Sequence, residues 1–326
     1  MTKVMDRPEA SGPPVAGEGS AARLASAGTG PGRPMAPDHP IARGADAELP
    51  SAVNAMSVDV EDYFQVSAFS ETVRRSDWET LSCRVERNVE SVLQLFADFD
   101  AKATFFTLGW VAESYPHLIK AIVDAGHELA SHGYEHVRVD HQNPDDFRED
   151  VRKTKALLED LGGTAVKGYR AASFSITKDT LWAFRILEEE GYSYSSSVYP
   201  IRHDHYGIPG APRFAYRPKQ SDSLTELPIT TFSLFGQNLP CGGGGYFRLL
   251  PYALSRWAMR RVNRQDNEAC IFYFHPWEID PEQPRVSDLT RLARFRHYTN
   301  LHRMERRLRR LLADFRWDRI DRVFFA

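Results

Sequence analysis

The sequence predicts an α/β fold in which buried strands alternate with helices. Two observations support this prediction: short apolar runs of strand length recur along the chain, and segments with the period of an amphipathic helix separate the early runs. Such alternation is typical of parallel strands joined by helical crossovers. About seven strand signals favour a barrel, and a doubly wound open sheet is the alternative. In both folds, reactive groups gather at the carboxyl ends of the strands.

The expected strands are seven apolar runs, at residues 52–60, 101–109, 127–131, 166–171, 192–200, 224–230 and 269–275. A helix is expected after the first strand, at 89–99, where apolar residues recur every three or four positions. Further helices are expected at 115–126, 143–163 and 178–191. The helix at 143–163 has the clearest boundaries, because Asn143 can cap it, Pro144 suits its first turn and Gly162 can end it.

Residues 1–50 differ in composition from the rest of the chain: 28 of these 50 residues are Ala, Gly, Pro or Ser, and none is aromatic. A segment with so little apolar surface is predicted to be a disordered tail. We expect the barrel at 51–280 and a C-terminal helical extension, packed on the barrel, at 281–326. Within the extension, residues 299–315 have an apolar face opposite several arginines, which indicates a docked helix or, alternatively, contact with an anionic surface or partner.

The composition excludes several classes of function. The 41 basic and 44 acidic residues nearly balance, so neither nucleic acid nor a membrane is an expected partner. Three scattered cysteines form no CxxC pair, which argues against a disulfide framework or a cysteine zinc site. The sequence has no apolar run of about 18 residues, so no transmembrane segment is expected, and no signal peptide is recognised in it. We therefore expect action in the cytoplasm, with the periplasm as the alternative.

Polar residues that can carry chemistry cluster at the ends of the expected strands. A pair of histidines four residues apart, His132 and His136, is weak evidence for a metal site when taken alone, although one helical turn would place both imidazoles on one face. The argument becomes stronger when all strand ends are taken together: they carry Asp59, Glu61, Asp62, His132, His136, Arg170 and His275. Two imidazoles and a carboxylate form a common catalytic zinc set, and the remaining carboxylate and histidine can act as base and acid.

With these motifs in this order, residues 53–280 resemble the polysaccharide deacetylases of carbohydrate esterase family 4, which share the nodulation deacetylase homology domain. The resemblance implies a distorted (β/α)7 barrel that removes acetyl groups from N-acetylated sugars. It also implies a divalent metal, with Zn²⁺ as the first choice and Co²⁺ or Ni²⁺ as alternatives. The segments SVDVEDYF, GGGGYFRLLPY and FRHYTNLHRMERRL resemble a bacterial subgroup linked to exosortase and exopolysaccharide loci. That subgroup implies an exopolysaccharide substrate and association with its assembly machinery.

The resemblance also implies roles for individual residues. Asp59 matches the catalytic base, Arg170 the arginine that contacts this base, and His275 the acid that protonates the leaving amine. His132 and His136 match the metal-binding pair. The metal carboxylate is Glu61 or Asp62, and the alternation of side chains along a strand favours Glu61, because it faces the same side as Asp59.

Some positions depart from the family pattern or remain open. Ala172 replaces the usual proline, and Ser195 replaces an aspartate. Trp277 and Tyr246 are candidates for stacking on a sugar ring, with core or rim packing as an equal interpretation. The glycine run of CGGGGYF lacks phosphate-loop spacing, so we expect a flexible loop over a groove. Two rival functions remain: an amidohydrolase of a small cyclic amide on the same scaffold, and a non-catalytic carbohydrate-binding barrel.

Overall fold

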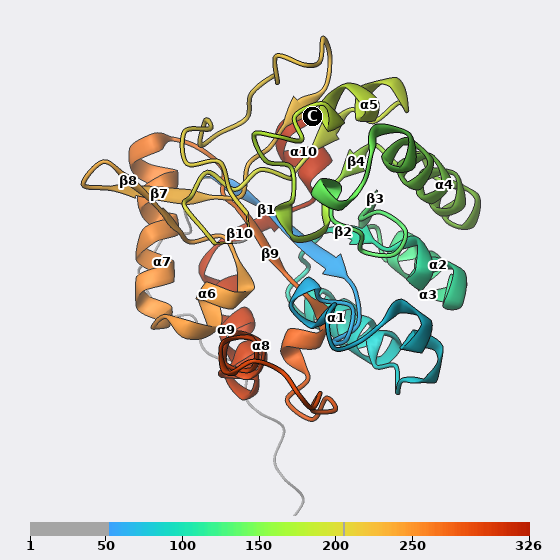
Figure 1. The fold of residues 1–326 in the computed structure, drawn as a ribbon. Helices are drawn as coiled ribbons and strands as arrows, with labels where there is room; N and C mark the ends of the chain where they lie inside the picture. The colour runs from blue at the N-terminus through green and yellow to red at the C-terminus, as the bar shows by residue number, and fades with distance from the viewer. Residues whose placement is uncertain (1–51, 205) are drawn as a thin grey trace, which may run out of the picture. The chain divides into compact units, whose positions relative to one another are not determined.

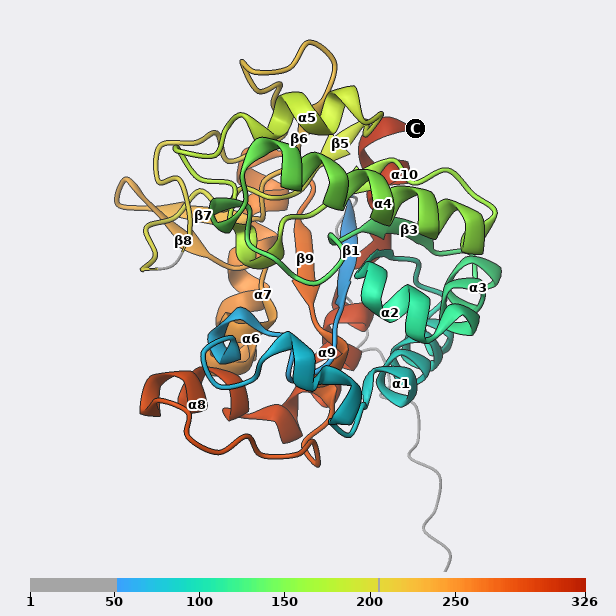
Figure 2. The ribbon, with the colours of Figure 1, turned by 45° about the vertical axis from the view of Figure 1, so that its right-hand side comes forward.

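The computed structural model of the protein describes residues 52–204 and 206–326, so the predicted tail at 1–50 lies outside the described residues. Eight strands form one curled parallel sheet. They follow one another in the order β10 (Arg316–Asp318), β1 (Val53–Val60), β2 (Thr104–Thr107), β3 (Glu128–Ser131), β4 (Gly168–Tyr169), β5 (Tyr194–Ser195) and β6 (Thr225–Glu226), while β9 (Ile271–Phe274) pairs with β1. Figures 1 and 2 show β1 and β9 side by side near the middle of the ribbon.

Each of the seven apolar runs predicted as strands contains a strand of this sheet. Strand β1 is buried along nearly its whole length, as expected for a parallel strand with neighbours on both sides. The barrel of β/α units is therefore confirmed, in a distorted form: within residues 52–204 and 206–326, no strand ladder joins β6 to β9. The predicted parallel direction is also confirmed for every pair in this sheet.

The early strands are followed by helices that lie along one side of the sheet (Figure 1). These helices are α1 (Val85–Asp98), α2 (Gly109–Ser114), α3 (Pro116–Asp124), α4 (Pro144–Gly162) and α5 (Ala183–Glu189). The boundaries predicted for α4 are confirmed, since the Asn143 side chain accepts hydrogen bonds from the amides of Asp145 and Asp146. The helix ends at Gly162, and the left-handed backbone of Gly163 (φ 60°) caps it.

The C-terminal part contains the elements that the sequence predicts less well. These are the hairpin of β7 (Thr231–Leu234) and β8 (Gln237–Pro240), and the helices α6 (Gly244–Leu249), α7 (Tyr252–Arg261), α8 (Arg291–Tyr298), α9 (Leu301–Asp314) and α10 (Ile320–Phe325). The docked helix expected at 299–315 is α9, whose apolar face is buried against the core. The same extension also contributes β10, which pairs with the first residues of β1. No helix among the described residues is long and apolar enough to span a membrane.

The expectation of a flexible glycine loop is wrong. Gly242, Gly243 and Gly244 are buried, and the last of them begins α6. The Gly242 carbonyl accepts a hydrogen bond from the Tyr273 amide on β9 (2.8 Å), and a Cβ atom on Gly242 would lie 2.4 Å from the carbonyl oxygen of Ile271. These glycines therefore allow the backbone before α6 to pack directly against β9.

Candidate active site

The end of β1 places two carboxylates on the same side of the sheet. Because side chains alternate along a strand, Val58 and Val60 pack in the core while Asp59 and Glu61 face the opposite way. Both carboxylates are buried, and both lie near one imidazole. The Nε2 atom of His275 is 4.0 Å from Asp59 Oδ2 and 3.4 Å from Glu61 Oε1. The structure thus brings together three of the residues predicted at strand ends, namely Asp59, Glu61 and His275.

Asp62 has a different environment. Its Oδ1 atom accepts a hydrogen bond from the Tyr63 amide (2.7 Å), and its Oδ2 atom accepts from the amides of Arg84 (2.5 Å) and Val85 (2.9 Å). Since the latter two amides lie at the start of α1, the carboxylate caps this helix at its positive end. Burial raises the pKa of Asp62 to about 6, and these hydrogen bonds oppose that shift. Of the two carboxylates left open by the sequence, only Glu61 joins the histidines.

His132 and His136 lie in the loop that follows β3 and not in a helix. Left-handed backbone at Gly133 (φ 77°) and at His136 (φ 53°) turns the chain, and the two imidazole centroids lie 5.2 Å apart. His132 Nδ1 donates to the carbonyl oxygen of Arg170 (2.8 Å), which leaves the Nε2 lone pair available. Burial lowers the pKa of His132 to about 4 and that of His136 well below 6.5. Both imidazoles are therefore neutral at neutral pH, as metal ligands must be.

Glu61, His132 and His136 have the donor atoms and the surroundings of a metal site. One ligand atom from each lies within 4.8 Å of the other two. Glu61 Oε2 is 3.0 Å from His136 Nε2, yet it is buried without a hydrogen bond to the described residues. Burial also raises the pKa of Glu61 to about 7, so this carboxylate lacks a sufficient compensating positive charge. The three residues therefore fit a divalent cation, and their two nitrogens and one oxygen are typical of catalytic zinc.

Arg170, which directly follows β4, fixes the orientation of Asp59. Its buried guanidinium donates through Nη1 to Asp59 Oδ1 (2.6 Å) and to Ser57 Oγ (2.9 Å). The other nitrogens donate to Ser196, from Nη2 to Oγ (3.0 Å) and from Nε to the carbonyl oxygen (3.1 Å). Because a charge-assisted hydrogen bond occupies Oδ1, the second carboxylate oxygen, Oδ2, is the one directed towards His275.

His275 follows β9 and is held by a second carboxylate, Glu278. The Nδ1 atom of His275 donates to Glu278 Oε1 (2.8 Å), and Glu278 Oε2 accepts from Arg248 Nε (2.6 Å). Burial alone would lower the pKa of His275, but the charges of Glu61, Glu278 and Asp59 outweigh it and raise the pKa to about 9. Burial would likewise raise the pKa of Glu278, but Arg248 and the hydrogen bond from His275 hold it below its usual range. The side chain of His275 is 21% exposed, so its imidazole can be reached from solvent.

The two aromatic residues proposed for sugar stacking differ in exposure. Trp277 is buried and lies between two imidazoles, stacked on His275 (centroids 5.0 Å apart) and on His297 of α8 (4.1 Å). Its Nε1 atom donates to Glu61 Oε1 (3.3 Å). Trp277 therefore packs against these imidazoles and has no free face on which a sugar could stack. Tyr246 on α6 is partly exposed and remains a candidate.

The departures at Ser195 and Ala172 are accommodated within the barrel. Ser195 Oγ donates to Ser197 Oγ (2.8 Å), and the residue opposite Ser195 on β6 is the buried Glu226. Glu226 Oε1 accepts from the amides of Ser197 (2.9 Å) and Val198 (2.8 Å), so a carboxylate from the neighbouring strand orders this loop. Ala172 is buried in a short 3-10 turn (Ala172–Phe174).

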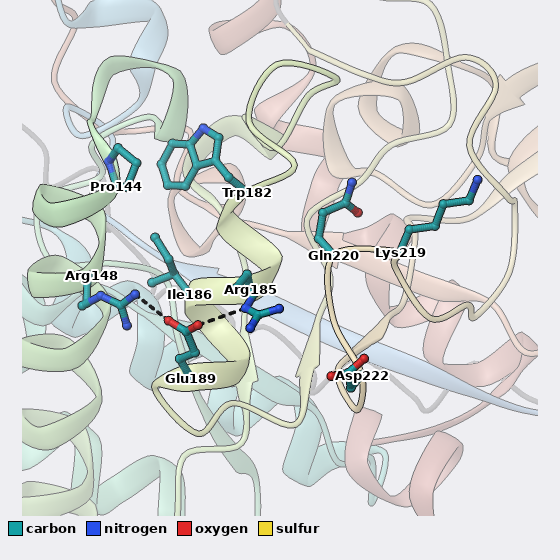
Figure 3. Close-up of a pocket in the computed structure, with 9 residues that line it drawn as sticks. All are labelled: Pro144, Arg148, Trp182, Arg185, Ile186, Glu189, Lys219, Gln220 and Asp222. Carbon is teal, nitrogen blue, oxygen red and sulfur yellow. Dashed lines mark hydrogen bonds and ion pairs between the residues drawn. The ribbon is translucent and has the colours of Figure 1, made fainter.

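An open pocket of about 520 Å³ lies elsewhere, between α4, α5 and the loop around residue 220. Figure 3 shows that Glu189 lies between Arg148 and Arg185 and is paired with both; Trp182 also lines the pocket. None of the strand-end residues named above lines this pocket. The candidate active site is therefore defined by its side chains and not by this cavity.

Two buried residues of the site are absent from the sequence prediction, namely Glu278 and Arg248. A signal for Glu278 exists in FHPWE, since a carboxylate three residues after His275 can fold back onto it in a single turn. Arg248 has no such signal, because it is 30 positions from Glu278 and meets it only through the packing of α6 on β9. Comparable long-range contacts do not follow from periodicity or motif spacing.

Comparison with known proteins relates two regions of the chain to families. Residues 78–194 match the model of the polysaccharide deacetylase family, and residues 196–325 match a domain of unknown function (DUF3473). A peptidoglycan-N-acetylglucosamine deacetylase of Bacillus cereus is 36% identical over 93 residues, which are 28% of this chain and 34% of that protein. A peptidoglycan deacetylase of Helicobacter pylori is 31% identical over 113 residues, or 35% and 38% of the two chains. The chain thus spans about a third of the length of these relatives.

Two solved structures share the fold over most of their length. One is described as a candidate polysaccharide deacetylase from Mycobacterium smegmatis, with a TM-score of 0.55 and 19% identity over 89% of this chain and 93% of the other. The other is the Puue allantoinase, with a TM-score of 0.54 and 17% identity over 89% and 96%. At this level of identity, the likeness concerns the barrel alone.

Proposed function

We propose that the chain is a metal-dependent hydrolase that removes N-acetyl groups from amino sugars of a bacterial polysaccharide, because residues 78–194 match the polysaccharide deacetylase family and two relatives are named as peptidoglycan deacetylases. One observation carries this proposal: ligand atoms of Glu61, His132 and His136 lie within 4.8 Å of one another, beside a buried aspartate and a histidine. A barrel that only bound carbohydrate would have no need of this combination.

In the proposed reaction, the chain's own residues move two protons. Asp59 Oδ2 accepts a proton from the water that attacks the acetyl carbonyl carbon, while Arg170 keeps the carboxylate in place through Oδ1. The carbon–nitrogen bond then breaks, and His275 donates the proton on Nε2 to the departing amine, so that acetate and an amino sugar are formed. Its other nitrogen, Nδ1, stays hydrogen-bonded to Glu278. A divalent cation held by Glu61, His132 and His136 would serve as the Lewis acid for the acetyl carbonyl oxygen.

The cation and the polymer are proposed on separate grounds. We propose Zn²⁺ as the cation, with Co²⁺ or Ni²⁺ as alternatives, because one carboxylate and two imidazoles suit these ions. An exopolysaccharide is proposed as the substrate because three segments resemble the subgroup linked to exopolysaccharide loci, and the match at residues 196–325 is consistent with it. Association with the assembly machinery of that polymer depends on the subgroup alone.

Acetate release is the decisive measurement. The purified chain, loaded with Zn²⁺, Co²⁺ or Ni²⁺ in turn, is incubated with N-acetylated exopolysaccharide, chitin oligosaccharides and peptidoglycan strands, and a small cyclic amide serves as the rival substrate. We expect acetate from at least one glycan, loss of that activity on chelation, and its return with metal. Hydrolysis of the cyclic amide alone would favour the amidohydrolase, and glycan binding without acetate would favour the non-catalytic barrel.

A further inference from the structure

We propose that Glu278 and Arg248 are positioning residues that orient His275 for its proton transfer, and that Gly244 provides the space that Glu278 needs. The inference rests on the proposed function, because it assumes that His275 protonates the leaving amine. It adds a network that runs from the imidazole through α6 to the end of α8. None of these three residues carries a role in the family resemblance described above.

Glu278 controls both the rotation and the tautomer of the imidazole. It is fully buried, and its Oε1 atom accepts from His275 Nδ1 (2.8 Å) and from the His275 backbone amide (3.1 Å). A proton shared with Glu278 on Nδ1 leaves Nε2 as the nitrogen that faces Asp59 Oδ2 and Glu61 Oε1. Trp277 stacks on one face of the ring, so both the direction and the plane of the imidazole are set.

Arg248 in turn fixes Glu278. Its Nε atom donates to Glu278 Oε2 (2.6 Å), while its Nη1 atom donates to the carbonyl oxygens of His297 (2.9 Å) and Thr299 (2.6 Å). The Nη2 atom donates to the Arg296 carbonyl oxygen (3.1 Å). These carbonyls lie at the C-terminal end of α8, where the helix dipole favours a positive charge. A planar guanidinium with four hydrogen bonds therefore holds the carboxylate in one position.

Gly244 is the point at which this network leaves no room for a side chain. A Cβ atom at this position would lie 2.3 Å from Glu278 Oε1 and 2.6 Å from Glu278 Oε2. The backbone cannot withdraw easily, since Gly242 is hydrogen-bonded to β9 and a Cβ there would meet the Ile271 carbonyl oxygen. The next residue, Gly245, is exposed, and a Cβ atom on it would meet nothing within 4 Å. An alanine at position 244 would therefore collide with the Glu278 carboxylate, whereas an alanine at position 245 would contact nothing.

This difference provides a matched pair of variants, Gly244→Ala and Gly245→Ala. Both replace a glycine in the first turn of α6 by alanine, so the two changes have the same intrinsic effect on the helix. Only Gly244→Ala should displace Glu278 and, with it, His275. Glu278→Gln is a second variant of nearly unchanged shape, in which the amide cannot accept from His275 Nδ1 and Arg248 Nε at the same time.

Two substrates separate positioning of the acid from a purely structural role. An N-acetylated glycan oligomer releases an amine that must be protonated, whereas 4-nitrophenyl acetate releases a phenolate that leaves without a proton. Misplacement of a catalytic group by about 1 Å can lower a rate by roughly 10²-fold. We therefore expect Gly244→Ala and Glu278→Gln to lower kcat on the glycan by roughly 10–100-fold, with KM, metal content and ester hydrolysis close to those of the wild type. Gly245→Ala should resemble the wild type on both substrates.

The possible results are distinguishable. Equal losses on the glycan and the ester would overturn the positioning role and leave the network as a structural one. Wild-type kinetics of Gly244→Ala and Glu278→Gln on the glycan would overturn it as well. A wild-type chain that hydrolyses 4-nitrophenyl acetate but releases no acetate from any N-acetylated glycan would instead refute the proposed function, together with the role of His275 on which this inference depends.

Discussion

The neighbouring acidic residues Glu61 and Asp62 allow a sharp test of the proposed site, because the structure gives them different surroundings. Replacing each by alanine separates metal binding from helix capping. Glu61 lies with His132 and His136 and has an unpartnered buried oxygen, whereas Asp62 accepts hydrogen bonds from three amides. We expect Glu61→Ala to lose metal and keep its stability, and Asp62→Ala to lose stability and keep its metal.

The size of the stability loss follows from the amides left behind. The amides of Tyr63 and Val85 belong to buried residues, while Arg84 is partly exposed, so water can replace the carboxylate at Arg84 but not at the other two. An unpaired buried donor costs about 1–3 kcal/mol, so the two that Asp62→Ala leaves should lower the free energy of unfolding by about 2–6 kcal/mol. In a domain of this size, 1 kcal/mol changes Tm by about 2–4 °C, so Tm should fall by at least about 4 °C.

The loss of metal affinity in Glu61→Ala should exceed the 10–100-fold that is typical when an outer partner of a ligand is removed. Metal content after dialysis against a graded chelator series measures this affinity, and calorimetry of the metal-free proteins measures Tm. Without metal, Glu61→Ala should be about as stable as the wild type, since it removes a buried carboxylate whose Oε2 atom has no hydrogen bond to the described residues and whose Oε1 atom accepts only a 3.3 Å bond from Trp277. Full metal retention in Glu61→Ala, or metal loss in a folded Asp62→Ala, would refute the assignment of the two carboxylates.

Three further predictions follow from the same geometry. Asp59→Asn should retain metal but lose about 10²–10⁴-fold in kcat for acetate release, because the amide cannot accept the proton; a loss below tenfold would contradict the base role. His132→Ala should lose most of its metal with an unchanged circular dichroism spectrum, whereas the exposed His141→Ala should retain it. Burial raises the pKa of Glu226 from 4.5 to about 7 in the folded chain. As the pH rises, the unfolded chain therefore loses this proton at a lower pH than the folded chain does, and the free energy of unfolding of the wild type falls between about pH 4.5 and 7. Denaturant titrations should therefore show that Glu226→Gln gains up to about 3 kcal/mol over the wild type above pH 7 and nothing below pH 4; a pH-independent difference would contradict the raised pKa.

The sheet could be predicted because each of its main strands is a buried apolar run with its own local signal. Strand β10 has none: it has only three residues, Arg316–Asp318, two of them charged, and it forms because it follows α9 and pairs there with the first residues of β1, Val53–Ala55. The prediction of a flexible loop at the glycine run 242–245 was wrong because the contacts of these glycines are also not evident from the local sequence. Glycine composition indicates a loop, but here the glycines are required by close contact with β9 and Glu278, which only the folded chain reveals.

The same limit applies to the candidate site. Asp59, His132, His136, Arg170 and His275 could be named because each stands at the end of a strand. The choice between Glu61 and Asp62 needed more than strand alternation, since it depends on where α1 begins. Burial of Trp277 between His275 and His297 likewise depends on α8, whose position has no signal in the sequence.

The two regions that match family models meet near residue 195, and the residues of the candidate site come from both sides of this boundary. Asp59 and Glu61 precede both regions, His132, His136 and Arg170 belong to the first, and His275 and Glu278 belong to the second. Strand β1 joins them, because it pairs with β2 of the first region and with β9 and β10 of the second. A chain cut near residue 195 would lose both β9 and β10 from β1, together with the proposed acid. The region of unknown function therefore supplies two strands that pair with β1, together with the histidine that we propose as the proton donor.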